Sequence, residues 1–171
     1  MMAVSKKVCL LGDFGVGKTS LVRRFVYDLF DDRYLSTIGV KVSRKTVIVP
    51  NHEDMAEMTM MLWDLAGSEE FDRIRASYLR GTAGAILVCD LTRPSTLESL
   101  DSYLRDLASI SPQAHIVVAG NKNDLLEQRQ VSAAQIEAFA AKNHYPWYLT
   151  SARNGEEVES LFRHLGRVML A

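Results

Sequence analysis

Short apolar runs alternate with amphipathic stretches along the whole chain. Runs of four to eight consecutive apolar residues are typical of strands that are buried on both faces of a sheet. The predicted strands cover residues 6–12, 40–50, 58–67, 83–92, 114–124 and 146–150. Apolar residues recur at helical spacing between these runs, and the predicted helices cover residues 19–30, 95–110, 132–143 and 156–170. The chain therefore contains six strands that alternate with helices after the third strand.

Strands that alternate with helices predict an α/β fold, with a six-stranded, mostly parallel sheet and helices on both faces. The polar segment 51–57 joins two consecutive strands, so we expect a hairpin loop there and an antiparallel edge strand. We expect the helix at 95–110 to begin at Ser95 as its N-cap, with Glu98 completing a capping box. No linker or internal repeat interrupts residues 1–171, which predicts a single domain.

Composition narrows the class of protein. Apolar residues make up 47% of the chain, and the formal net charge of -1 provides no basic field for nucleic acid or an anionic membrane. Cys9 and Cys89 both lie in apolar runs, which predicts buried thiols in a reducing compartment. No apolar run approaches the about 20 residues needed to span a bilayer, and we find no signal peptide or lipidation cysteine. We expect a cytoplasmic protein that reaches membranes only through a missing lipidated tail or a partner.

A glycine-rich segment follows the first predicted strand and opens the first predicted helix. Gly12, Gly17, Lys18 and Thr19 fit the pattern G-x-x-x-x-G-K-[ST], which needs this strand-to-helix context. Backbone N–H groups of such a loop and of the helix N-terminus point at an anion. Lys18 adds a full positive charge for the β and γ phosphates, and the Thr19 hydroxyl suits Mg²⁺. The segment predicts a site for a nucleoside triphosphate. We expect phosphate contacts from residues 13–20, namely Asp13, Phe14, Gly15, Val16, Gly17, Lys18, Thr19 and Ser20.

Two short polar segments after the last two strands indicate which base is bound. In N-K-N-D (121–124), the Asp124 carboxylate can accept both hydrogen bonds that the N1–H and N2 amine of guanine donate. Adenine offers no such pair of donors, so a buried carboxylate would oppose its binding. Asn121 would connect loops and Lys122 would pack across the base. In S-A-R (Ser151, Ala152 and Arg153), the Ala152 N–H can donate to guanine O6.

Taken together, the segments GDFGVGKTS, STIGV, WDLAGSEEF, NKND and SAR resemble the Ras superfamily of small GTPases. They occur in the family's order and cover essentially the whole chain. TIGV and RASYLRGTAGAILVCDLT are most similar to the Rab branch. The resemblance implies a P-loop NTPase fold (a small G domain), GTP and GDP as ligands with Mg²⁺, and a switch between two nucleotide states.

The resemblance also implies individual roles. Phe30 would lie edge-on across the base, although a plain core residue is the alternative, and Tyr34 would close over the phosphates. Thr37 would bind Mg²⁺ and the γ-phosphate, with a surface turn as the alternative, and Asp64 would hold Mg²⁺ through water unless it caps a helix. Gly67 would offer its N–H to the γ-phosphate. Thr19, Thr37 and Asp64 form the expected metal site, and Lys18, Thr37, Gly67 and Ser68 the expected catalytic set.

Two positions depart from the family pattern. Ser68 stands where most members have a glutamine that orients the attacking water, a role for which Ras is the standard worked example. Phe14 stands where Ras has glycine, and its ring either crowds the entry of an activating arginine or folds away over the loop. We therefore expect slow GTP hydrolysis. Glu69 and Glu70 are alternative water-positioning groups, although both also fit the start of a helix in the second switch.

Three functions stay open on the sequence alone. The first is a regulatory GTPase with effectors, an exchange factor and an activating protein that supplies Gln or Asn in trans. Candidate residues for the surface that effectors contact are Ile38, Val40, Trp63, Phe71 and Tyr78, of which several, Trp63 above all, are alternatively core residues. The second is a non-catalytic GTP-binding module. The third, an ATP-dependent phosphotransferase, is opposed by NKND and SAR. The acidic segment 51–57 could hold a metal ion, but a solvated turn is the favoured interpretation.

Overall fold

A single twisted sheet of six strands forms the centre of the molecule. The computed structural model describes residues 1–31, 39–67 and 75–171. The strands are β1 (Met2–Leu11), β2 (Val40–Asn51), β3 (Asp54–Leu65), β4 (Gly84–Asp90), β5 (His115–Asn121) and β6 (Trp147–Leu149). Their order across the sheet is β2-β3-β1-β4-β5-β6, and only the β2–β3 pair is antiparallel. This confirms the predicted fold class and the antiparallel edge.

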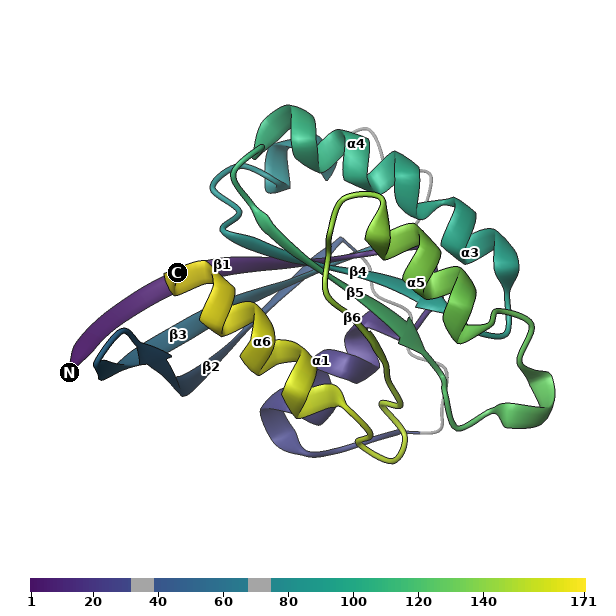
Figure 1. Ribbon diagram of the computed structural model, residues 1–171, viewed down its shortest axis with the longest axis horizontal. Coiled ribbons are helices and arrows are strands. Elements are labelled where there is room, and N and C mark those ends of the chain that lie inside the picture. The colour runs from purple at the N-terminus through teal and green to yellow at the C-terminus, as the bar shows by residue number, and fades with distance from the viewer. Residues whose placement is uncertain (32–38, 68–74) are drawn as a thin grey trace.

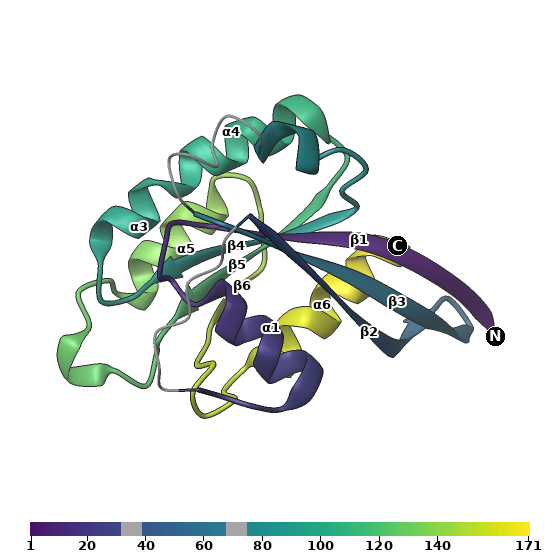
Figure 2. The ribbon, with the colours of Figure 1, turned by 180° about the vertical axis from the view of Figure 1, so that it is seen from behind.

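Helices cover both faces of the sheet (Figure 1 and, from behind, Figure 2). They are α1 (Lys18–Tyr27), α3 (Pro94–Glu98), α4 (Leu100–Ile110), α5 (Ala133–Ala141) and α6 (Val158–Leu170), with a short 3₁₀ turn, η1 (Leu126–Gln128). On one face α1 and α6 pack over a core in which the rings of Phe25 and Phe162 stack 4.0 Å apart. On the other face α4 and α5 pack over a second core that contains Leu107, Ile136 and Phe139.

Burial of β1, β4 and β5 explains their uninterrupted apolar sequence. Every residue of β4 is buried, as are the last four residues of β1 and the last six of β5. Cys9 and Cys89 are free, buried thiols within these strands, as predicted, and burial raises the pKa of both. Among the described residues, no helix has both the length and the apolar character that a membrane span requires.

The hairpin between β2 and β3 is much tighter than predicted. Asn51 pairs with Asp54, which leaves a turn of two residues, with His52 at φ 54°. The expected loop at 51–57 is therefore wrong, because most of it belongs to β3 and Ala56 pairs with Met2 of β1 on the other side. No group of three or more potential metal ligands occurs among the residues that the structure describes, so the acidic segment is a turn and a strand end.

Two predicted helices also differ at their ends. The helix predicted at 19–30 ends at Tyr27, because Asp28 adopts a left-handed conformation at its C-cap. The helix predicted at 95–110 begins at Pro94 and is divided at Ser99 into α3 and α4. The expected Ser95 cap is wrong, since Arg93 occupies the cap position without a side-chain capping hydrogen bond and Pro94 takes the first helical position that suits proline.

The carboxyl ends of the parallel strands lie at one edge of the sheet. In a sheet of this kind, loops that follow these ends form the crevice where ligands bind. The loops after β1, β3, β5 and β6 carry nearly all of the motifs that the sequence singled out. The fold therefore brings these four separate segments of the chain to one edge of the sheet.

Candidate functional site

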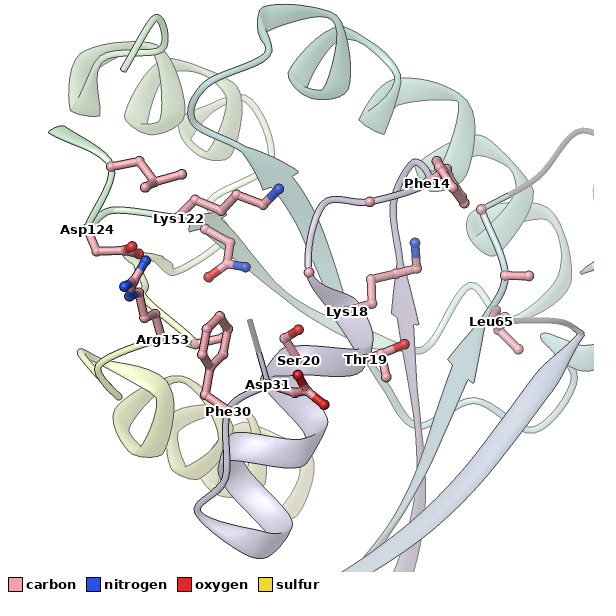
Figure 3. Close-up of a pocket in the computed structure, with 17 residues that line it drawn as sticks. Phe14, Lys18, Thr19, Ser20, Phe30, Asp31, Leu65, Lys122, Asp124 and Arg153 are labelled. Atoms are coloured by element: carbon pink, nitrogen blue, oxygen red, sulfur yellow. The ribbon is translucent and has the colours of Figure 1, made fainter. Parts of the chain in front are cut away.

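A cavity of about 300 Å³ opens at this edge of the sheet (Figure 3). Five segments line it: the loop after β1 with the start of α1, the stretch after α1, the end of β3, the loop after β5 and the loop after β6. Thirteen of the predicted site residues line the cavity: Phe14, Gly15, Gly17, Lys18, Thr19, Ser20, Phe30, Gly67, Asn121, Lys122, Asp124, Ala152 and Arg153. The predicted phosphate and guanine segments therefore share one cavity.

Lys18, the first residue of α1, lies at one end of the cavity. Its ammonium group donates hydrogen bonds to the carbonyls of Gly12 at 2.6 Å and Asp13 at 2.9 Å. Burial lowers the pKa of Lys18 to about 8, although the carboxylates of Asp64 and Asp13 oppose this effect. The cation is therefore held among dipoles of its own loop, at a position where an anion would find an unneutralised positive charge.

The loop before Lys18 requires glycine at its last position. Gly17 has a φ of 106°, a conformation that L side chains rarely adopt. A Cβ at this position would also lie 2.2 Å from the Nδ2 atom of Asn121. Asn121 itself is buried and donates from Nδ2 to the carbonyl of Val16 at 3.0 Å, while its Oδ1 accepts from Thr150 at 3.0 Å. Asn121 thus connects the phosphate loop with the two loops after β5 and β6, as predicted.

The opposite end of the cavity carries the group predicted to recognise guanine. Figure 3 shows Asp124 and Arg153 at this end, close to the ring of Phe30, and Lys18 and Phe14 at the other end. Ser151 donates a hydrogen bond of 2.7 Å to Oδ1 of Asp124, which fixes the position of the carboxylate. Phe30 is 36% exposed and lines the cavity, so it is not a core residue.

Oxygen ligands gather beside the phosphate end. The Thr19 hydroxyl donates to Oδ2 of Asp64, which is buried at the end of β3. A hydroxyl and a carboxylate are ligands that Mg²⁺ prefers, and their proximity to Lys18 fits a cation that bridges protein and phosphate. Asp64 belongs to β3, which excludes the alternative of a helix cap. The third predicted ligand, Thr37, lies outside the described residues.

Phe14 lies at the mouth of the cavity on the phosphate side. Its side chain is 50% exposed and lines the cavity together with Gly67. Gly67 approaches the loop so closely that an added Cβ would lie 2.5 Å from the backbone nitrogen of Phe14. Arg93 donates a hydrogen bond of 2.9 Å to the carbonyl of Phe14 from the outer side of the loop. The ring therefore borders the space next to Lys18 and Gly67.

Three predicted binding residues lie behind the cavity wall. Val16 is fully buried, Ser151 bonds to Asp124, and the Asp13 carboxylate accepts from the hydroxyl of Tyr103 at 3.0 Å. Other predicted residues lie outside the described residues, namely Tyr34, Ile38, Ser68, Glu69, Glu70 and Phe71, in addition to Thr37. Four cavity residues were not predicted: Asp31, Leu65, Ala66 and Leu125. Leu125 directly follows the predicted Asp124, so its position was the available signal.

The predicted effector surface is partly core. Val40, Trp63 and Tyr78 are each partly buried against the second core cluster. The rings of Trp63 and Tyr78 lie 6.1 Å apart, and the Lys7 ammonium lies 3.9 Å from the Trp63 ring centroid. Lys7 also donates to the carbonyl of Arg80 at 2.8 Å. Trp63 is therefore in part a core residue, as the alternative interpretation expected, and its contact with effectors stays a prediction.

Comparison with known proteins supports the assignment that the motifs suggest. A sequence model described as "Ras family" matches residues 7–171. Mouse (Mus musculus) "Ras-related protein Rab-22A" is 40% identical over 162 residues, which cover 94% of this chain and 81% of that protein. "Ras-related protein Rab-31" of Rattus norvegicus is 37% identical over 169 residues, or 98% of this chain and 85% of its own. "GTP-binding protein ypt5" of Schizosaccharomyces pombe is 36% identical over 169 residues, with 98% and 79% covered.

Proposed function

The chain belongs to the Ras family and is Rab-like, and we propose that it is a guanine-nucleotide switch with slow GTP hydrolysis. Members of this family are GTPases, so GTP binding and hydrolysis are the general activity. The proposal adds the residues that carry the activity, the reason that hydrolysis is slow, and the way in which partners detect the nucleotide.

One observation carries the proposal. Lys18 and Asp124, the two side chains expected to hold opposite ends of a guanosine polyphosphate, line the same cavity. A lysine in a glycine-rich loop suits phosphate, and a fixed carboxylate suits the N1–H and N2 amine of guanine. Neither group alone is specific, because polar turns and phosphate loops are common. Their combination in one cavity supports GTP over ATP.

The residues around the phosphates would act as follows. Lys18 exchanges the carbonyls of Gly12 and Asp13 for phosphate oxygens, which restores a fully charged partner for a buried cation. Thr19, Asp64 and Thr37 would hold Mg²⁺, which neutralises charge that develops on the phosphates. Thr37 and the N–H of Gly67 would hold the γ-phosphate and order the two switch loops. Loss of that phosphate removes both attachments, so a partner that contacts the ordered loops distinguishes the two nucleotide states.

Two residues argue for slow hydrolysis. Ser68 replaces the glutamine that orients water in other family members, and a serine side chain is much shorter than that of glutamine. Phe14 lines the cavity beside Gly67 and borders the space that an arginine from an activating protein would enter. Loss of one positioning group commonly slows a reaction by about two to three orders of magnitude. We propose that an activating protein restores turnover by supplying Gln or Asn in trans.

A second candidate is a GTP-binding module that does not turn over. The position of Phe14 favours it, because a ring that lines the phosphate end of the cavity would crowd the entry of an activating arginine. Effectors and an exchange factor are the partners of the switch, whereas a module would keep its nucleotide within an assembly. We propose a cytoplasmic site of action, with peripheral membrane attachment only through a lipidated tail or a partner.

Single-turnover hydrolysis of GTP tests the slow-hydrolysis proposal. We expect Ser68→Gln to raise the rate constant by about a hundredfold or more, since a water-orienting amide is returned. Ser102→Gln places the same substitution on an exposed position of α4 and serves as the matched control. Phe14→Ser should leave the basal rate of Ser68→Gln nearly unchanged and increase its response to an arginine-bearing activator. A wild-type rate equal to that of Ser68→Gln would refute the proposal.

The bound nucleotide separates the two candidates. Mass analysis of the nucleotide that co-purifies with the protein should find GTP if turnover is slow or absent. Phosphate release over many turnovers, with and without cell extract, then distinguishes a switch from a module that never hydrolyses GTP. Displacement of labelled GDP by excess ATP would contradict guanine specificity itself.

A further inference from the structure

Asp90 is a buried carboxylate at the end of β4 that the motifs do not include. Its side chain is 1% exposed and accepts four hydrogen bonds. Oδ1 accepts from the N–H of Thr92 at 2.8 Å and from its hydroxyl at 2.6 Å. Oδ2 accepts from Nε of Arg93 at 3.0 Å and forms an ion pair with Nζ of Lys122 at 2.9 Å. A single carboxylate oxygen therefore holds two cations.

The two cations connect Asp90 with loops at opposite ends of the cavity. Lys122 belongs to the segment after β5 that lines the guanine end. Arg93 uses a second nitrogen, Nη2, to donate to the carbonyl of Phe14 in the phosphate loop at 2.9 Å. Residues 14 and 122 are more than a hundred positions apart in the sequence, yet three contacts connect them through Arg93 and Asp90. Asp90 stands at the midpoint of this connection.

We propose that Arg93, Asp90 and Lys122 form a relay that couples the phosphate loop to the guanine-binding loop, so that the two loops hold and release nucleotide together. Arg93 and Asp90 are positioning residues in this proposal, because they act through Phe14 and Lys122. The relay rests on the proposed function, since it concerns retention of the nucleotide in that same cavity.

The chemistry of the contacts supports a coupled arrangement. Burial alone would raise the pKa of Asp90, but hydrogen bonds from Thr92 and Lys122 outweigh it and hold the pKa below its ordinary value. The carboxylate is therefore ionised at neutral pH and needs its cations, because an uncompensated buried charge is strongly unfavourable. When one cation moves away, the carboxylate is less fully compensated, and its interaction with the other cation changes. A displacement of the phosphate loop at Phe14 would in this way alter the position of Lys122.

Arginine at position 93 is suited to this role by its shape. The planar guanidinium offers donors in several directions, and here Nε bonds to Asp90 while Nη2 bonds to Phe14. A lysine has one nitrogen at the end of a flexible chain and does not reproduce this two-sided contact. Arg93→Lys keeps the positive charge but loses the two-sided contact of the guanidinium, so it shows which of the two properties matters.

Arg163 provides a closely matched control elsewhere in the molecule. It also joins a carboxylate to a backbone carbonyl, with Nε 2.7 Å from Glu159 and Nη1 3.1 Å from the carbonyl of Ile48. Both arginine side chains are 42% exposed. Arg163 does not line the cavity. Arg163→Ala therefore removes the same chemistry without touching the relay.

The test is the dissociation rate of fluorescent GDP from the protein with Mg²⁺ present. We expect Arg93→Ala to release GDP about tenfold faster, which is the effect of losing one charge-assisted hydrogen bond. Arg93→Lys should release it nearly as fast as Arg93→Ala, and Arg163→Ala at the wild-type rate. Thermal melting of each variant shows that it is folded. Full rescue by lysine, or equal rates in wild type and Arg93→Ala, would overturn the relay.

Coupling is tested by combining Arg93→Ala with Lys122→Ala. Because Lys122→Ala already removes the end of the relay, the double variant should release GDP no faster than Lys122→Ala alone. Independent residues would instead multiply their separate effects, and that outcome would overturn the relay. Failure of the wild-type protein to take up GDP at all is a different result, because it refutes the proposed function on which the relay depends.

Discussion

The two ends of the cavity are prepared for their ligand to different degrees. At the guanine end, Ser151 holds Asp124 and Thr150 holds Asn121 through hydrogen bonds of 2.7 and 3.0 Å. At the phosphate end, Lys18 donates to carbonyls of its own loop, and burial lowers its pKa to about 8. We expect the first arrangement to accept guanine without rearrangement. The second keeps a cation in a poor environment until an anion arrives.

This difference separates the sources of selectivity and of switching. Fixed groups give selectivity because binding need not order them. A poorly solvated cation gains most from an anion, so the phosphate end is expected to change its hydrogen bonds between states. The guanine end should therefore set which nucleotide binds, and the phosphate end should set how the protein responds to it. The following experiments test this division, from the largest expected effect to the smallest.

Removal of the guanine-binding carboxylate should have the largest effect. We expect Asp124→Ala to weaken GDP binding by about 3 kcal/mol, or roughly 100-fold, because two hydrogen bonds to a charged acceptor are lost. Calorimetry with GDP and ADP measures it. Glu53→Ala removes an exposed carboxylate at the turn between β2 and β3 and should change neither affinity. An equal loss of GDP and ADP binding would break the comparison, because Asp124 would then not recognise the base.

Loss of the Asn121 side chain should reduce stability as well as binding. We expect Asn121→Ala to lower the free energy of unfolding by about 2 kcal/mol, since the Val16 carbonyl and the Thr150 hydroxyl lose a buried partner. Urea denaturation of the nucleotide-free protein measures this change. Asn143→Ala, an exposed position after α5, is the control and should have almost no effect. Similar values for both would show that the guanine end is not held by Asn121.

The fold was largely predictable because apolar runs record burial directly. β4 and β5 are apolar except at their ends, where Asp90, His115 and Asn121 lie, since both faces are covered, and this pattern located them. The β2–β3 turn was not predictable in the same way. Polar residues 51–57 suggest a loop, but Met55 and Ala56 pair with Pro50 and Val49 at the end of the antiparallel ladder. Within this segment Ala56 alone is buried, so the sequence resembles that of a loop although it belongs to a strand.

Site residues were predictable where the residue type, at its place in a motif, has a single common chemical role. Lys18 and Asp124 belong to this class, and both line the cavity. Asp90 and Arg93 were not predictable, because a buried carboxylate at a strand end and an arginine before a proline have many uses. Their proposed role depends on two contacts with residues far along the chain, Lys122 and Phe14. Such contacts appear only when the strands are placed side by side.

The state of Lys18 predicts a pH effect on the phosphate end. Because folding lowers its pKa from 10.5 to about 8, the unfolded chain binds more protons between these values, and stability should rise with pH there. We expect the free energy of unfolding without nucleotide, in EDTA, to increase by about 1 kcal/mol from pH 8 to pH 9 relative to Lys18→Met. Urea titrations of both proteins measure the difference. A constant difference over this range would show that Lys18 is no less solvated than an ordinary lysine.

The smallest expected effect concerns how firmly the guanine end is prepared. Ser151→Ala removes the hydroxyl that donates to Asp124 at 2.7 Å but leaves the carboxylate itself in place. We expect GDP binding to weaken about threefold, roughly 0.6 kcal/mol, because the carboxylate must then be ordered by the ligand. ADP binding should not change. In the Asp124→Ala background, Ser151→Ala should cost nothing further, since it acts through Asp124. An additional threefold loss in that background would show that Ser151 contacts the nucleotide itself, so that the guanine end is not simply a carboxylate held in advance by its neighbours.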